Sequence, residues 1–148
     1  MMNQNSENTN AFIIHIAAFG EFFFPFGGIV TPLILWQTLK NRSAFLDQQG
    51  REAVNFNISY SLYMFIARMI VGPFFIRSVF FNRNLSDSYW NFDWLDFDFS
   101  LGGVFGLVGL TSLVGFIGLT KLILAILAAL KANKGENYTY PLTIKFIK

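Results

Sequence analysis

The chain has 148 residues, of which 53% are hydrophobic and 14% are charged, and its formal net charge is +2. The charged share lies well below the roughly 25% of water-soluble domains, and so small a net charge gives no reason to expect a nucleic acid partner. Cysteine is absent, which excludes disulfides, thiolate metal sites and thiol nucleophiles.

Three long apolar stretches make up more than half of the chain: residues 12–39, 54–81 and 101–130. Each exceeds the ~20 helical residues that cross the hydrocarbon core of a bilayer. Each is also apolar on nearly all sides, unlike the surface helices of soluble domains. The sequence therefore predicts an all-α membrane protein with about three transmembrane helices. These form a single transmembrane domain, residues 12–148, with the lipid bilayer as its first partner.

The first stretch follows a polar lead-in, residues 1–11, which we expect to be frayed. Pro25, Gly27, Gly28 and Pro32 interrupt this stretch, so a straight helix is excluded. Either one helix kinked at Pro25–Gly28 crosses the membrane, or two half-length helices form a re-entrant hairpin there. Each half would have only about 13 residues, too few to span, and we therefore prefer the kinked single helix.

The loops differ in charge, and this orients the chain. Residues 40–53 contain Lys40, Arg42 and Arg51, and the tail, residues 131–148, contains Lys131, Lys134, Lys145 and Lys148. The loop 82–100 has Arg83 against Asp87, Asp93, Asp96 and Asp98. Basic residues collect on the cytoplasmic side. We expect a multi-pass protein of the bacterial cytoplasmic membrane, with the tail inside and the N-terminus outside. The acidic, aromatic loop 82–100 then lies outside as an interfacial anchor.

Glu21, Arg68, Arg77 and Lys121 are ionisable residues inside apolar stretches, where each needs a partner or a route to water. Counting residues from the membrane surface gives Glu21 and Arg68 similar depths, which predicts an ion pair between them. We interpret this pair as a latch between helices. The alternative function is a small transporter or channel that uses Glu21 and Arg68. Arg77 and Lys121 lie close enough to an end of their stretch to reach a membrane face.

Small residues recur along the third stretch, with Gly102, Gly106 and Gly109 on one helix face and Gly115, Gly118, Ala125 and Ala129 on another. Such spacing lets helices approach closely in lipid, within the bundle or between copies in a homo-oligomer. His15 is a lone histidine, which makes a poor metal site. We expect it to form an interfacial hydrogen bond. The sequence contains no recognised catalytic motif, so we predict no enzyme activity, catalytic residue, metal site or cofactor.

Three segments resemble a known family: HIAAFGEFFFPFGGIVTPLILW (residues 15–36), AFLDQQGREAVNFNISYSLY (residues 44–63) and LKANKGENYTYPLTIKFIK (residues 130–148). They are similar to a widespread bacterial family of uncharacterised small membrane proteins. That family is in turn similar to the chloroplast inner-envelope protein-import component of the Tic complex. The resemblance implies a non-enzymatic membrane protein, an accessory or scaffold in membrane protein handling, with a membrane-protein partner. The long loop 82–100 departs from the family pattern.

The most specific parts of this resemblance form a candidate cytoplasmic-face motif: Gly50, Glu52, Asn55, Tyr140 and Pro141. We expect Gly50 to turn the chain into the second helix and Glu52 to occupy that helix's first turn. Pro141 excludes helix, so the tail should be extended. Larger apolar side chains alternate along it from Tyr138 to Phe146 and should share one face. This face is predicted either to cover the cytoplasmic ends of the helices or to pack on the segment Phe45–Phe56.

Overall fold

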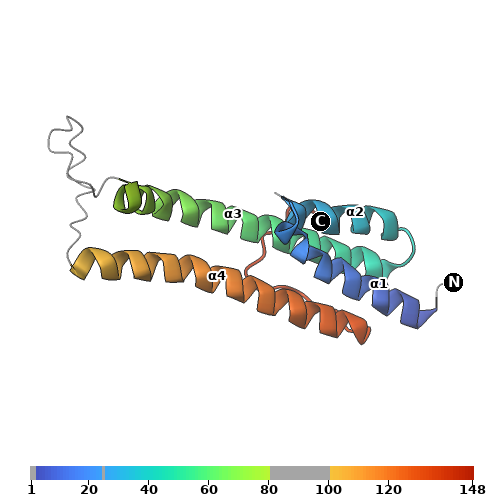
Figure 1. The fold of residues 1–148 in the computed structure, drawn as a ribbon. Coiled ribbons are helices and arrows are strands. Elements are labelled where there is room, and N and C mark those ends of the chain that lie inside the picture. The colour runs from blue at the N-terminus through green and yellow to red at the C-terminus, as the bar shows by residue number, and fades with distance from the viewer. Residues whose placement is uncertain (1–2, 25, 81–100) are drawn as a thin grey trace. The chain divides into compact units, whose positions relative to one another are not determined.

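The computed structural model describes residues 3–24, 26–80 and 101–148 and is helical throughout its regular parts (Figure 1). The elements in order are α1 (Gln4–Ile16), the short 3-10 helix η1 (Ala17–Phe22), α2 (Gly27–Leu39), α3 (Ala44–Phe80) and α4 (Leu101–Asn133). The predicted all-α class is confirmed. The acidic loop predicted at 82–100 lies outside the described residues.

The N-terminal segment is helical from Gln4, so the expectation of a frayed lead-in is wrong. Asn3 stands before the first turn and its side chain accepts a hydrogen bond from the backbone N–H of Asn5 at 3.4 Å. This is the position where asparagine stabilises a helix start. Farther along, Ala11 and Ile14 are fully buried, so packing also holds α1 in place.

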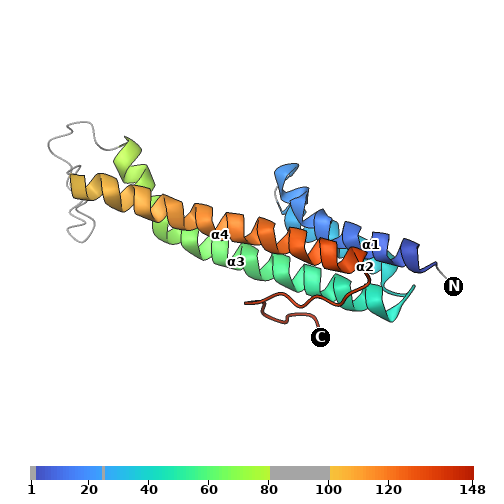
Figure 2. The same ribbon diagram turned by 90° about the horizontal axis from the view of Figure 1, so that it is seen from below.

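The first apolar stretch forms two short helices, and the preferred single kinked helix over residues 12–39 is not formed. The chain turns back at Phe26, whose φ of 64° is left-handed and stops helix propagation. Two glycines allow the return: a Cβ added to Gly27 would lie 2.1 Å from the carbonyl oxygen of Gly20. Because only glycine permits this approach, α2 packs on η1 and α1 as a hairpin, as both views show (Figures 1 and 2).

Helix α3 begins ten residues before the predicted second span. The Ser43 hydroxyl accepts a hydrogen bond from the backbone N–H of Leu46 at 3.1 Å, which stabilises this earlier start. Within the part of the chain that the structure describes, one helix is long and apolar enough to cross a membrane, Thr111–Asn133 of α4. Helix α2 is apolar but has only 13 residues. The count of three spans therefore stays a prediction.

The chain divides into two compact units, residues 1–62 with 120–148, and residues 63–119. In the first unit, both ends of the chain contribute to the packed interior. Its apolar cluster contains Ala11, Ile14, Leu39, Leu46, Ala53 and Ala132. Ala125 and Ala129 of α4 are buried here, whereas Gly115 and Gly118, which belong to the second unit, face open space. The small residues of α4 thus serve helix packing at its C-terminal half.

Gly50 lies within α3, and the expectation that it turns the chain into that helix is wrong. Its role is to admit the indole of Trp36 from α2, because an added Cβ would come within 2.2 Å of Trp36 Cδ1. The indole Nε1 donates to Asp47 Oδ1 at 2.9 Å, which fixes the ring over α3. Arg51, hydrogen-bonded to Asp47, lowers the pKa of that carboxyl and keeps it a charged acceptor.

We predict that Gly50→Ala destabilises the protein by about 1–3 kcal/mol, the usual cost of overpacking a filled contact. Gly72→Ala in the same helix is the matched control, since a Cβ there meets nothing within 4 Å. Both variants gain up to about 1 kcal/mol of helix propensity, so their difference isolates the collision with Trp36. Thermal unfolding in mild detergent measures it. Equal melting temperatures for the two variants would contradict the packing role of Gly50.

Candidate functional site

A buried hydrogen-bonded network joins α1, α3 and the C-terminal tail. The Tyr140 hydroxyl and His15 Nδ1 lie 2.9 Å apart, and His15 Nε2 lies 2.9 Å from Gln49 Oε1. Gln49 Nε2 then donates to Asn137 Oδ1 at 3.2 Å. His15 and Gln49 are fully buried and Tyr140 is 4% exposed, so these polar groups depend on one another for partners.

The direction of the network follows from its end groups. Gln49 Oε1 can only accept, so His15 Nε2 carries a proton and donates to it. Burial lowers the pKa of His15 to about 4, so the ring is neutral and its Nδ1 accepts a hydrogen bond from the Tyr140 hydroxyl. In this tautomer both imidazole nitrogens are satisfied. The predicted hydrogen-bonding role of His15 is confirmed, but its place is in the protein interior.

The Tyr140 ring anchors the tail to α3. It stacks on Phe56 with ring centroids 3.8 Å apart and an interplanar angle of 13°. Phe56 in turn lies 4.6 Å from Tyr60 at a tilted angle. Such aromatic contacts are favourable beyond the area that they bury. Pro141, the next residue of the predicted motif, is exposed.

Two polar side chains of α3 bind the backbone of the tail. Asn55 Nδ2 donates to the carbonyl of Ile147 at 2.9 Å, and the amide of Ile147 donates to Asn55 Oδ1 at 2.8 Å. One helical turn later, the amide of Ile144 donates to the Ser59 hydroxyl at 2.9 Å. The tail therefore lies along α3 (Figure 2). The side chains of Asn55 and Ser59 supply the hydrogen bonds that bind its backbone.

The predicted folding-back of the tail is confirmed, but the predicted apolar face is wrong. Leu142 has a φ of 57°, which breaks the alternation expected of an extended chain. Leu142, Ile144 and Phe146 are 79%, 43% and 50% exposed, so they do not cover the helix ends. Hydrogen bonds and the single ring of Tyr140 hold this segment.

The structure brings Glu52 to the tail as well, where Lys145 Nζ lies 3.7 Å from its Oε1. Glu52 is 8% exposed and its Oε2 atom has no hydrogen-bond partner. Of the candidate motif, Glu52, Asn55 and Tyr140 thus contact the tail or belong to it. Gly50 instead contacts Trp36. Sequence reasoning missed Gln49 and Ser59. For Ser59 a signal existed, because it follows Asn55 by four positions on the same helix face.

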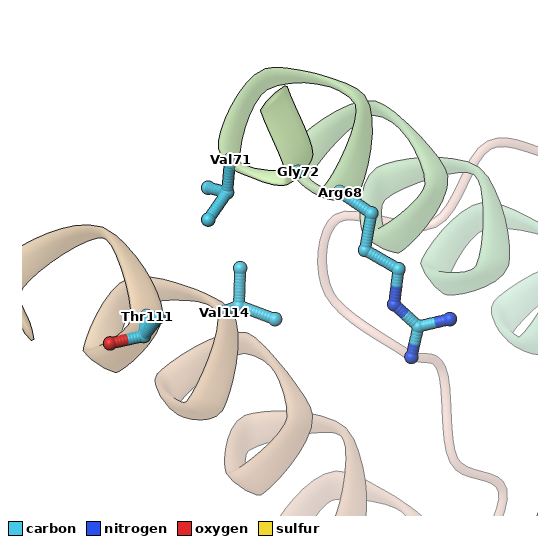
Figure 3. Close-up of a pocket in the computed structure, with 5 residues that line it drawn as sticks. All are labelled: Arg68, Val71, Gly72, Thr111 and Val114. Atoms are coloured by element: carbon cyan, nitrogen blue, oxygen red, sulfur yellow. The ribbon is translucent and has the colours of Figure 1, made fainter. Parts of the chain in front are cut away.

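Glu21 lies beside a charged residue of α4. Its carboxylate forms an ion pair with Lys121 of α4, whose side chain is 6% exposed. Arg68 belongs to the second unit, where it lines a hollow of about 210 Å³ with Val71, Gly72, Thr111 and Val114 (Figure 3). Val71 and Val114 point toward each other across this hollow. A pairing of Glu21 with Arg68 stays a prediction.

The described residues contain no group of three or more His, Cys, Asp or Glu side chains placed to hold a metal ion. The side chains at the centre of the first unit hydrogen-bond to one another and to the tail. Chemically, this arrangement can bind a peptide backbone and fix helices in register. We therefore describe it as a docking site that the protein's own tail occupies.

Comparison with known proteins corrects the family assignment. A family model described as magnetosome magnetite crystal formation protein family matches residues 6–147. No curated protein and no solved structure matches the chain. The resemblance to the bacterial relatives of the Tic import component is therefore wrong, and the role in membrane protein handling that it implied is withdrawn.

We predict that Tyr140→Phe destabilises the protein by about 1–3 kcal/mol, because the buried His15 Nδ1 loses its donor while the stack on Phe56 stays. Tyr138→Phe is the control. Tyr138 is partly exposed and contacts Tyr140 edge-on, so its hydroxyl should matter by less than about 0.5 kcal/mol. Melting temperatures in detergent compare the two. Equal shifts would contradict the network.

We also predict that the two tail anchors can be separated by amide hydrogen exchange. Asn55→Ala should speed exchange of the Ile147 amide more than that of Ile144, because Ser59 still binds Ile144. Ser59→Ala should reverse the order. If both variants release both amides equally, the tail is held by other contacts.

Proposed function

The chain thus belongs to the magnetosome magnetite crystal formation protein family, and from this premise we propose that it is a non-enzymatic scaffold of the magnetosome membrane. Family membership over residues 6–147 makes it a magnetosome membrane protein concerned with magnetite crystal formation. The proposal adds the mode of action. The protein supports crystal formation by holding helices and a partner in place within the membrane, and it carries out no chemical step itself.

One observation carries this proposal: apart from Glu52 Oε2 and Asn57 Oδ1, which have no hydrogen-bond partner, the buried polar side chains of the first unit bind one another or the tail. His15, Gln49 and Tyr140 form a closed network, and Asn55 and Ser59 bind the tail backbone. A catalytic or transport site needs polar groups left available to a substrate. These groups are engaged internally, which supports a structural role.

The partner of such a scaffold is proposed to be a membrane protein or a second copy of the chain. Along α4 of the second unit, Leu113, Phe116 and Leu119 are more than half exposed, and a Cβ added to Gly115 or Gly118 meets nothing within 4 Å. Small residues beside large apolar ones let a second helix approach closely in lipid. This surface of α4 is therefore the one we propose for the partner.

The competing proposal is a small transporter or channel that uses Glu21 and Arg68. Lys121 supports the scaffold instead, because it neutralises Glu21 as a latch between η1 and α4 would. Separating the proposals requires a variant that removes both charges, since a lone charge buried in low dielectric is itself destabilising. Glu21→Gln with Lys121→Gln meets this requirement.

In a magnetite-forming bacterium lacking its own copy, the wild-type gene should restore the normal distribution of crystal sizes, measured by electron microscopy. The double variant Glu21→Gln/Lys121→Gln should restore it as well, provided that immunoblots show equal protein in the magnetosome membrane. Tyr140→Phe should restore it only in proportion to the amount of folded protein. Iron flux into liposomes containing the purified wild-type chain, abolished in the double variant, would instead establish the transporter.

A further inference from the structure

The turn between η1 and α2 exposes four aromatic side chains. Phe22, Phe23, Phe24 and Phe26 are 68%, 86%, 45% and 77% exposed. An isolated apolar side chain on a surface is ordinary, but a contiguous apolar patch on a loop marks a place where water is absent. Glu21, the residue before these side chains, is neutralised by Lys121. We call Phe22–Phe24 with Phe26 the aromatic tip.

The position of this tip along α4 can be measured. At the base of the hairpin, Asn8 lies beside Gly135, since a Cβ on that glycine would be 3.2 Å from Asn8 Oδ1. At the tip, Glu21 is paired with Lys121. Lys121 precedes the end of α4 at Asn133 by 12 residues, which is about 18 Å along a helix axis. The hydrocarbon core is about 30 Å thick, so the tip reaches roughly its middle.

The irregular backbone of the tip is suited to lipid, where an unsatisfied polar group costs several kcal/mol. The amides of Phe23 and Phe24 donate to the carbonyl of Gly20 at 3.1 and 3.4 Å, and the amide of Gly27 donates to that of Phe24 at 3.0 Å. The amides of Ile29 and Val30 both donate to the carbonyl of Phe26. The turn thus satisfies much of its own backbone without water.

The base of the hairpin has the opposite character. Lys40 and Arg42 follow the end of α2, and Lys131 and Lys134 mark the end of α4 beside it. Such basic side chains at helix ends are typical of the headgroup region, where they anchor a membrane protein.

We propose that α1, η1 and α2 form a re-entrant hairpin whose aromatic tip lies among the acyl chains near the middle of the bilayer. The hairpin enters and leaves on the side that carries the basic segments. The N-terminus therefore lies on the same side of the membrane as the C-terminus, in place of the opposite side that three spans would give. This inference rests on the membrane location of the chain and not on its role as a scaffold.

The absence of native cysteine allows a clean test with single-cysteine variants of the full chain. Ser6→Cys and Asn41→Cys report the two ends of the hairpin, and Phe23→Cys reports the tip. Leu142→Cys is the matched control, because Leu142 is 79% exposed against 86% for Phe23. The variants are expressed in the cytoplasmic membrane of a host without magnetosomes. A membrane-impermeant maleimide is applied to its spheroplasts and inverted vesicles, and total cysteine is measured after unfolding in dodecyl sulfate.

We expect Ser6→Cys, Asn41→Cys and Leu142→Cys to react in the inverted vesicles alone, and Phe23→Cys to react at least tenfold more slowly in both preparations. A spin label at Phe23 should be relaxed by oxygen, which dissolves in lipid, and not by a water-soluble nickel complex. Two results would overturn the hairpin. One is labelling of Ser6→Cys and Asn41→Cys from opposite sides, and the other is labelling of Phe23→Cys as fast as Leu142→Cys.

Discussion

The structure of the first unit depends on the need of one buried imidazole for two hydrogen-bond partners. His15 is fully buried, and the groups that satisfy it come from α3 and from the C-terminal tail. Leaving a buried donor or acceptor unpaired costs more than a made hydrogen bond gains. A shift of the helices or release of the tail would leave the imidazole without a partner and would therefore be unfavourable. The hydrogen bond to the imidazole fixes the position of the tail. The stacking of Tyr140 on Phe56 and the binding of Ile147 by Asn55 stabilise the tail further in that position.

The helical class and the return of the tail could be predicted from the sequence because apolar length and proline placement are local signals. The hairpin could not be predicted. The length of the apolar stretch 12–39 favoured one span, whereas the hairpin depends on a left-handed Phe26 and on a contact between Gly20 and Gly27. Neither a strained φ at phenylalanine nor a glycine pair across a turn has a sequence pattern of its own. The ion pair of Glu21 with Lys121 could not be predicted either, because it depends on where the hairpin places Glu21 beside α4.

Two residues of the candidate motif illustrate the limits of the sequence. Gly50 was expected to provide backbone freedom at a turn, but its lack of a side chain makes room for Trp36. Asn55, for which the motif implied no particular partner, binds the peptide backbone of the tail. Polar residues inside an apolar helix indicate that a hydrogen-bonding partner contacts them. Here the partner is the C-terminal tail, which lies far away in the sequence, so the pattern of one helix does not identify it.

The distance in sequence between these partners has a consequence for biosynthesis. His15 and Tyr140 are separated by 125 positions, so nearly the whole chain must be made before they meet. Until the tail is made, the imidazole lacks its tyrosine partner, and Asn55 and Ser59 of α3 lack the backbone groups that they bind. Contacts of such high sequence separation form late and leave earlier segments exposed to misassembly. Residues made late thus complete the fold of residues made early, and a chain truncated before Tyr140 would leave His15 without one of its partners.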